Sequence, residues 1–161
     1  MAVGLRPLTQ DDLPRLRQSW KDNWGDEFVV AHGVIYRPEA LDGFVALDGD
    51  EWAGEITYHF SESDCEIVSL DSLRQGQGIG TQLIEKVIGV AREKGCRRIF
   101  VITTNDNLHA LGFYQKRGFE LVAIHRGVVT ESRKIKPSIP LIGNDGIPLK
   151  DEIELEMKLI D

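Results

Sequence analysis

The sequence is poor in cysteine, with only Cys65 and Cys96 among its 161 residues. Neither lies in a catalytic cysteine–histidine signature, and two cysteines do not make a disulfide framework, so buried thiols are expected. No two of the four histidines have the spacing of a helical zinc pair. The sequence therefore predicts neither a disulfide scaffold nor a metal site.

Long apolar runs and an excess of positive charge are also missing. No stretch approaches the ~20 apolar residues of a membrane helix, and residues 1–7 do not resemble a signal peptide. These features predict a cytoplasmic protein with no membrane partner. The 19 basic residues are outnumbered by 26 acidic ones, giving a formal charge of −7, which argues against a nucleic-acid partner.

What is present is the composition of an ordinary globular protein, with 42% hydrophobic and 28% charged residues. The length predicts a single domain over residues 1–161. In its first half, the apolar patterns predict a strand at 5–8, a helix from Asp11, a hairpin over 44–60 and a strand at 65–73. Trp20, Trp24 and Phe28 indicate a second helix within residues 20–43.

The second half begins with a change of period. A helix is expected from Ile79 to Gly95, followed by an apolar strand at 98–103 that should run parallel to strand 65–73. A helix over 108–117 and a strand over 119–124 follow. The last segment alternates strictly over 153–159, which is typical of an edge or half-exposed strand.

The most informative stretch is Arg74-Gln75-Gly76-Gln77-Gly78-Ile79-Gly80-Thr81, between a predicted strand and a predicted helix. Glycines allow close backbone approach, and a helix start presents free N–H groups, so this loop suits a phosphate or pyrophosphate. It lacks the lysine of a nucleotide-triphosphate loop and does not complete a dinucleotide fingerprint. The plainer alternative is a tight turn, although three glycines are more than a turn requires.

Two motifs resemble those of a known family. Gln75-Gly76-Gln77-Gly78-Ile79-Gly80 resembles the Gln/Arg-x-x-Gly-x-Gly/Ala signature of the GNAT superfamily of acyl-CoA-dependent N-acyltransferases. The stretch from Asn107 to Phe119 resembles that family's Asn-x-x-Ala-x-x-Phe-Tyr-x-x-x-Gly-Phe pattern. The two motifs stand in the family's order, and the resemblance covers about residues 5–125 together with the final strand.

The resemblance implies an α+β or α/β fold with a mixed central sheet, an antiparallel N-terminal meander and flanking helices. A central parallel strand pair would splay around acetyl-CoA, the co-substrate, and the acceptor would be a small-molecule or protein amine. The residues then expected to bind acetyl-CoA are Leu70, Ser72, Leu73, Gln75, Gly76, Gln77, Gly78, Ile79, Gly80, Thr81, Asn107 and Tyr114. Asn107 directly precedes a helix, so it is also a candidate N-cap.

Chemistry in such a site needs a proton donor for the departing thiolate and a proton acceptor for the amine. Tyr114 stands at the family's tyrosine position and is the candidate acid, with core packing as its alternative. We expect Tyr114 to face the cleft and Phe113 to face the core. Glu66 is the candidate base, because some relatives keep a glutamate at that position; Asp71 or a water chain are alternatives. His32 and His59 are expected to be structural.

Three features leave alternatives open. The Pro- and Gly-rich segment 126–151 is either a lid or a surface loop, and its basic residues either contact an anionic group or form an exposed loop face; these are Arg126, Arg133, Lys134 and Lys136. The exposed last strand suggests a homodimer. Beside an acetyltransferase, a non-catalytic acyl-CoA-binding regulatory module and a nucleotide-phosphate binder are possible functions.

Overall fold

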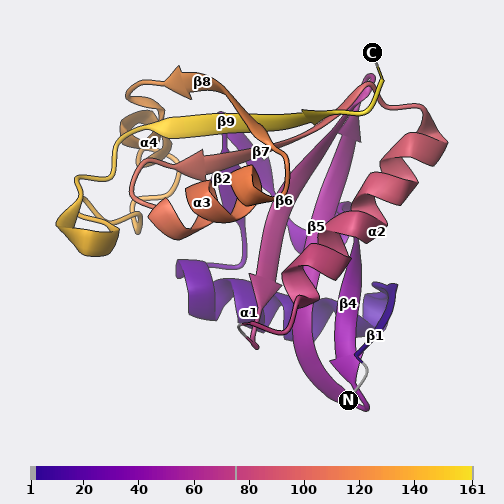
Figure 1. The fold of residues 1–161 in the computed structure, drawn as a ribbon. Helices are drawn as coiled ribbons and strands as arrows, with labels where there is room; N and C mark the ends of the chain where they lie inside the picture. The colour runs from indigo at the N-terminus through magenta and orange to yellow at the C-terminus, as the bar shows by residue number, and fades with distance from the viewer. Residues whose placement is uncertain (1–2, 75, 161) are drawn as a thin grey trace.

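The computed structural model describes residues 3–74 and 76–160 (Figure 1). Its centre is a seven-stranded mixed sheet in the order β1-β4-β5-β6-β7-β9-β8. The strands are β1 (Gly4–Pro7), β4 (Asp42–Asp48), β5 (Glu51–Ser61), β6 (Asp64–Ser72), β7 (Arg98–Thr104), β8 (Glu120–His125) and β9 (Glu152–Lys158). The helices are α1 (Leu13–Trp24), α2 (Ile79–Lys94), α3 (Leu108–Lys116) and α4 (Val128–Ser132), and a separate hairpin consists of β2 (Val29–Ala31) and β3 (Val34–Tyr36).

The predicted parallel pair is β6 and β7, which α2 connects. The two strands pair only from Asp64 opposite Arg98 to Ile67 opposite Val101. Beyond this point they diverge, as Figure 1 shows. The antiparallel meander of β4, β5 and β6 is also as predicted. In its register with β5, β6 skips Val68, a bulge that coincides with the end of its pairing with β7.

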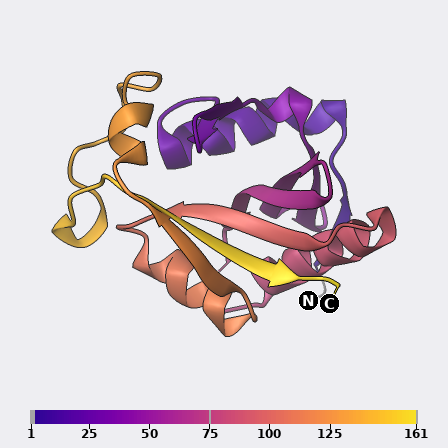
Figure 2. The same ribbon diagram turned by 90° about the horizontal axis from the view of Figure 1, so that it is seen from above.

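Helices cover the two faces of the sheet differently (Figure 2). Helices α2 and α3 lie on one face, and α1 with the β2–β3 hairpin lies on the other. Helix α2 buries the apolar side that its sequence period predicts, with Leu83, Val87 and Ala91 inaccessible to solvent. These side chains pack with Ile99 and Leu155 of the sheet in one core.

The second helix predicted within residues 20–43 is wrong. Helix α1 already contains Trp20 and ends at Trp24, because Gly25 takes the left-handed conformation that terminates helices. The chain then forms the β2–β3 hairpin, whose strands are rich in valine and isoleucine. Such β-branched side chains favour strands, and this preference outweighs the pattern of aromatic residues.

Of the two alternatives predicted for the last strand, the edge strand is wrong, since β9 lies between β7 and β8. The half-exposed strand agrees with the structure, because most residues of β9 are only partly buried. Its alternation arises because the two faces of the sheet differ. Leu155 is buried under the helices, whereas Glu154 and Glu156 on the other face accept hydrogen bonds from Arg98 at 2.7 and 2.8 Å. The edge strand at this end of the sheet is β8.

Segment 126–151 is held by its own basic residues. Arg133 donates to the carbonyl oxygens of Ile139, Pro140 and Leu149. Lys136 is only 5% exposed and donates to the carbonyl of Phe28 at 3.0 Å. Neither predicted alternative fits Arg133 and Lys136, because both make internal contacts. No helix among the described residues is long and apolar enough to cross a membrane.

Candidate active site

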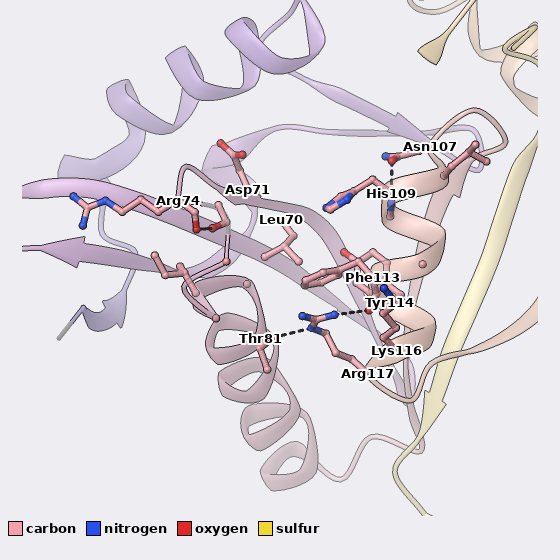
Figure 3. A pocket seen from close by; sticks show the side chains of 18 residues that line it. Leu70, Asp71, Arg74, Thr81, Asn107, His109, Phe113, Tyr114, Lys116 and Arg117 are labelled. Carbon is pink, nitrogen blue, oxygen red and sulfur yellow. Dashed lines mark hydrogen bonds between the residues drawn. The ribbon is translucent and has the colours of Figure 1, made fainter. Parts of the chain in front are cut away.

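A cleft of about 640 Å³ opens where β6 leaves β7, between the start of α2 and the length of α3 (Figure 3). The side chains around it come from the end of β6, the glycine-rich loop and one side of α3. They belong to Leu70, Asp71, Ser72, Arg74, Gly76, Gly78, Ile79, Gly80, Thr81, Asn107, Leu108, His109, Ala110, Gly112, Phe113, Tyr114, Lys116 and Arg117.

The glycine-rich loop has a shape that only glycine adopts without strain. Gly76 and Gly78 have φ angles of 78° and 72°, and Gly78 is the N-cap of the 16-residue helix α2. A Cβ atom on Gly80 would lie 3.0 Å from the ring of Phe113, so this glycine lets α2 approach α3 closely. The first free N–H groups of α2 and the positive pole of its dipole therefore lie at the cleft.

Nine of the twelve predicted binding residues line the cleft: Leu70, Ser72, Gly76, Gly78, Ile79, Gly80, Thr81, Asn107 and Tyr114. Gln75 lies outside the described residues. Gln77 and Leu73 are not at the cleft wall. The Leu73 side chain is 50% exposed and its N–H donates to the carbonyl of Ala53, so its backbone donor is already used by the sheet.

Arg117, which was not among the predicted site residues, joins α2 and α3 at the cleft (Figure 3). Its guanidinium lies 3.6 Å from the centre of the Phe113 ring and donates to Thr81 Oγ1 at 2.8 Å and to the Phe113 carbonyl at 2.9 Å. The spacing of four residues from Phe113 was the available signal, because such residues share a helix face. Arg74 also lines the cleft but binds Asp48 at 2.6 Å.

Asn107 is the N-cap of α3, the alternative that its position predicted. Its Oδ1 accepts a hydrogen bond from the N–H of Ala110 at 3.0 Å. Within the described chain its amide nitrogen makes no hydrogen bond. The side chain therefore offers the cleft an N–H₂ donor while its oxygen stabilises the helix.

Phe113 and Tyr114 both line the cleft, so the expectation that they separate between cleft and core is wrong. Neighbouring helical residues are only about 100° apart, and a broad cleft receives both. Tyr114 is the more enclosed, at 6% exposure, and also packs on Phe119. Burial raises the pKa of its hydroxyl, with a further contribution from the charge of Glu55, so the phenol stays protonated at neutral pH.

Comparison with known proteins decides the family. The sequence pattern of the Acetyltransferase (GNAT) family matches residues 5–119. This chain belongs to the GNAT acetyltransferase family. It is 45% identical to the uncharacterized protein YxbD of Bacillus subtilis (strain 168) over 158 residues, covering 98% of this chain and 99% of that one. It is 44% identical to the uncharacterized protein YdhI of the same organism over 140 residues, covering 86% and 87%.

Solved structures of acetyltransferases share the fold. A GNAT family acetyltransferase from Elizabethkingia anophelis with acetyl-CoA bound superposes with a TM-score of 0.73 at 24% identity, covering 98% of each chain. A Bacillus subtilis acetyltransferase in complex with CoA gives 0.72 at 24% identity, covering 99% of this chain and all of that one. The predicted fold, a mixed GNAT sheet with flanking helices, is confirmed.

In this GNAT chain, Glu66 does not lie at the cleft wall but on the opposite face of β6, under the β2–β3 hairpin. It is 2% exposed. His32 Nε2 lies 2.9 and 3.0 Å from the two carboxylate oxygens of Glu66, and the Tyr36 hydroxyl donates to Glu66 Oε1 at 2.5 Å. The hydrogen bond to Glu66 raises the pKa of His32. The predicted base is therefore covered by a histidine that the sequence suggested was merely structural.

The hairpin is held over Glu66 by a second carboxylate. The backbone N–H of His32 donates to Glu152 at 3.0 Å, and the His32 side chain remains 36% exposed. His59, which was expected to be structural, packs its ring 5.7 Å from that of Tyr36. Asp71, the alternative base, lines the cleft and accepts a hydrogen bond from Asn23 of α1 at 3.0 Å.

A second buried carboxyl, Glu55 on β5, carries no sequence motif and was missed. It is fully buried and accepts a hydrogen bond from Ser69 Oγ at 3.0 Å, while its Oε1 has no partner among the described residues. Burial raises its pKa to about 8. No group of three or more His, Cys, Asp or Glu side chains in the described chain is arranged to hold a metal ion.

Proposed function

We propose that this protein is an acetyl-CoA-dependent N-acetyltransferase that transfers the acetyl group to a primary amine by direct attack. The observation that carries the proposal is the cleft beside the end of β6 that diverges from β7, with a glycine-lined helix start at one end and a buried tyrosine on α3 beside it. Acetyl-CoA, when bound, supplies the activated thioester.

The residues around the cleft fit the two halves of such a ligand. The free N–H groups at the start of α2, next to Gly78, suit the pyrophosphate, and the nearby guanidinium of Arg117 adds positive charge. The diverging end of β6, at Leu70 and Ser72, offers backbone groups to the amide-rich pantetheine arm, and Asn107 offers its amide nitrogen. Gly76 has no side chain, so the ligand can approach the backbone of the loop closely at this position.

Two groups on the cleft side would act on the thioester. Backbone N–H groups beyond the bulge at Val68 would donate to its carbonyl oxygen as negative charge develops there. Tyr114, kept protonated by its enclosed position, would donate its proton to the departing thiolate sulfur.

The amine would arrive from the other face of the sheet and lose its proton there. Glu66 is too enclosed to touch an acceptor, whereas His32 is partly exposed and bound to it. We therefore assign the proton acceptor to His32, with Glu66 as the positioning residue that holds the ring by Nε2. The ring's Nδ1 makes no hydrogen bond with the described residues and would accept the proton. Ile67 and Val101, the last paired residues of β6 and β7, mark the gap through which the amine would meet the thioester.

The test is thiol release from acetyl-CoA with a panel of small amines, amino acids and peptide N-termini. Tyr114→Phe is expected to lower kcat by about 10²–10⁴-fold with little change in CoA affinity, which is the usual range for a general acid. Tyr58→Phe is the matched control, because it removes a buried hydroxyl from β5 that is absent from the cleft wall.

The same assay separates the alternatives. CoA binding without thiol release on any amine, and no effect of Tyr114→Phe, would identify a non-catalytic acyl-CoA-binding module. Thermal stabilisation by ATP or NAD but not by CoA would identify a nucleotide-phosphate binder. For His32, the measurement is the pH profile of kcat/KM: activity should fall on the acid side as the imidazole protonates, and His32→Gln should remove that limb.

A further inference from the structure

The edge strand β8 lacks the protection that the opposite edge has. It pairs with β9 on one side, and no other described strand lies beyond it. Its free edge makes no backbone hydrogen bond within the described chain. At the other edge of the sheet, β1 is four residues long and ends in Pro7, which cannot donate to a further strand. Strand β8 has six residues with neither proline nor lysine.

Two apolar side chains of β8 lie next to core residues of β9 but are themselves exposed to solvent. Leu121 lies opposite Leu155, and Ile124 lies opposite Ile153, both on the helix-covered face of β9. The bulge between Leu121 and Ala123 puts Leu121 and Ile124 on this same face although they are three residues apart. They are nevertheless 57% and 67% exposed, so the apolar layer of the sheet is cut off at this strand.

The two ends of β8 carry opposite charge. Glu120 begins the strand, and the exposed Arg126 directly follows its last residue, His125, whose Nε2 lies 3.0 Å from Glu154 Oε1. A second copy of β8 in parallel orientation would bring Glu120 against its own equivalent. In antiparallel orientation, the acidic end of each strand faces the basic end of the other.

We propose that a second copy of this chain pairs antiparallel with β8 and joins the two seven-stranded sheets into one. In the register that places Leu121 opposite Ile124 of the partner subunit, both apolar pairs lie on the helix-covered face. Glu120 then lies opposite His125 of the partner subunit on the other face, beside the partner's Arg126. Both strands carry the same bulge, because the two copies are related by a two-fold axis. Each strand therefore has two residues between Leu121 and Ile124, and the two strands have equal length between the apolar pairs.

Sedimentation velocity on the full chain over a range of concentrations tests this proposal. The unmodified protein should form a dimer whose fraction rises with concentration. Ile124→Lys should weaken the dimer by at least about tenfold in Kd, since it removes two apolar pairs and places a lysine opposite each Leu121. Ile160→Lys is the matched control, because Ile160 is also 60% exposed but lies beyond the end of β9.

Exchanging the charges at the two ends of β8 distinguishes this antiparallel register from any other pairing of the strand. Glu120→Lys and Arg126→Glu should each weaken the dimer, and the double variant should restore it. Circular dichroism and thermal unfolding verify that each variant is folded. A monomer at every concentration would overturn the proposal, and so would a dimer that Ile124→Lys leaves intact. Failure of the double variant to recover would overturn the antiparallel register.

Discussion

The carboxyl of Glu55 is fully buried, with one oxygen bound by Ser69 and the other without a hydrogen bond from any residue that the structure describes. Such a site favours the neutral acid, and burial accordingly raises the pKa of Glu55 to about 8. In the unfolded chain the same carboxyl titrates near 4.5. Between these two values the folded protein holds a proton that the unfolded chain has released.

Stability should therefore fall as pH rises from about 5 to about 8, because the unfolded state binds fewer protons over that window. A single group contributes up to about 1.4 kcal/mol per pH unit. Glutamine has nearly the shape of glutamic acid but does not titrate. The free energy of unfolding of Glu55→Gln, relative to that of the unmodified protein, should therefore increase as pH rises. Urea denaturation at pH 5, 6, 7 and 8 measures this. The exposed Glu85→Gln should show no such trend; equal slopes for both variants would exclude the role of Glu55.

Asn107 combines two tasks that substitution can separate. Its oxygen caps α3, and its amide nitrogen faces the cleft. Asn107→Ser keeps a capping oxygen and removes the amide, so it should weaken CoA binding while leaving the melting temperature almost unchanged. Asn107→Ala removes both and should also cost about 1 kcal/mol of stability. Calorimetric titration with CoA and thermal unfolding report the two effects; equal CoA affinity of Asn107→Ser and the unmodified protein would leave Asn107 only its structural role.

At the scale of the element, the start of α2 is the feature on which CoA binding should depend most. Gly78 has a φ of 72°, and its position is open to the cleft. Gly78→Glu would strain the backbone and add a negative charge where we expect the pyrophosphate. The affinity for CoA should fall by at least about 100-fold, or about 2.7 kcal/mol in binding free energy, because backbone strain and charge repulsion both oppose binding.

Gly89→Glu provides the control, since it adds the same charge to an exposed position of the same helix. Isothermal titration with CoA compares the two variants. If Gly78→Glu binds CoA as tightly as Gly89→Glu does, the pyrophosphate does not lie at this loop.

The elements that the sequence predicted well are those with one dominant local signal. Helix α2 has a continuous apolar stripe and a terminating glycine, and β7 contains a continuous apolar run with one face buried and the other partly buried. The hairpin β2–β3 was missed because three-residue strands are too short to show a period. The position of β9 was missed because alternation tells which faces a strand has, and the neighbours of a strand depend on the whole sheet.

The candidate site divides in the same way. The cleft residues lie within two contiguous motifs, so their order along the chain was enough to predict them. The contact between His32 and Glu66 joins positions 34 residues apart on elements that were not predicted to meet. Glu55 was missed because its burial follows from the packing of α1 on the sheet, and a single glutamate in a strand carries no pattern of its own.

At the scale of the whole molecule, segment 126–151 contacts the N-terminal half of the chain next to the β2–β3 hairpin. Lys136 donates to the carbonyl of Phe28 at 3.0 Å, and its ammonium lies 5.2 Å from the centre of the Phe28 ring. Phe28 directly precedes β2, which leads to His32 over Glu66. Burial lowers the pKa of Lys136, because removing the ammonium from water disfavours its charged form. The contact therefore fixes the hairpin more than it raises overall stability.

Lys136→Met tests this coupling, because methionine fills the space of the lysine stem without its hydrogen bond. Global stability should change by less than about 1.5 kcal/mol, since losing the hydrogen bond is balanced by no longer burying a charge. Amide hydrogen exchange should become at least about tenfold faster in the β2–β3 hairpin, because its anchor at Phe28 is gone, and stay unchanged in β5 and β6. Lys134→Met is the control, since the Lys134 side chain in the same segment is exposed and, among residues 3–74 and 76–160, binds only Glu131. Unchanged exchange in the hairpin would mean that its own strand pairing and the Glu66 and Glu152 contacts of His32 hold it without the C-terminal segment.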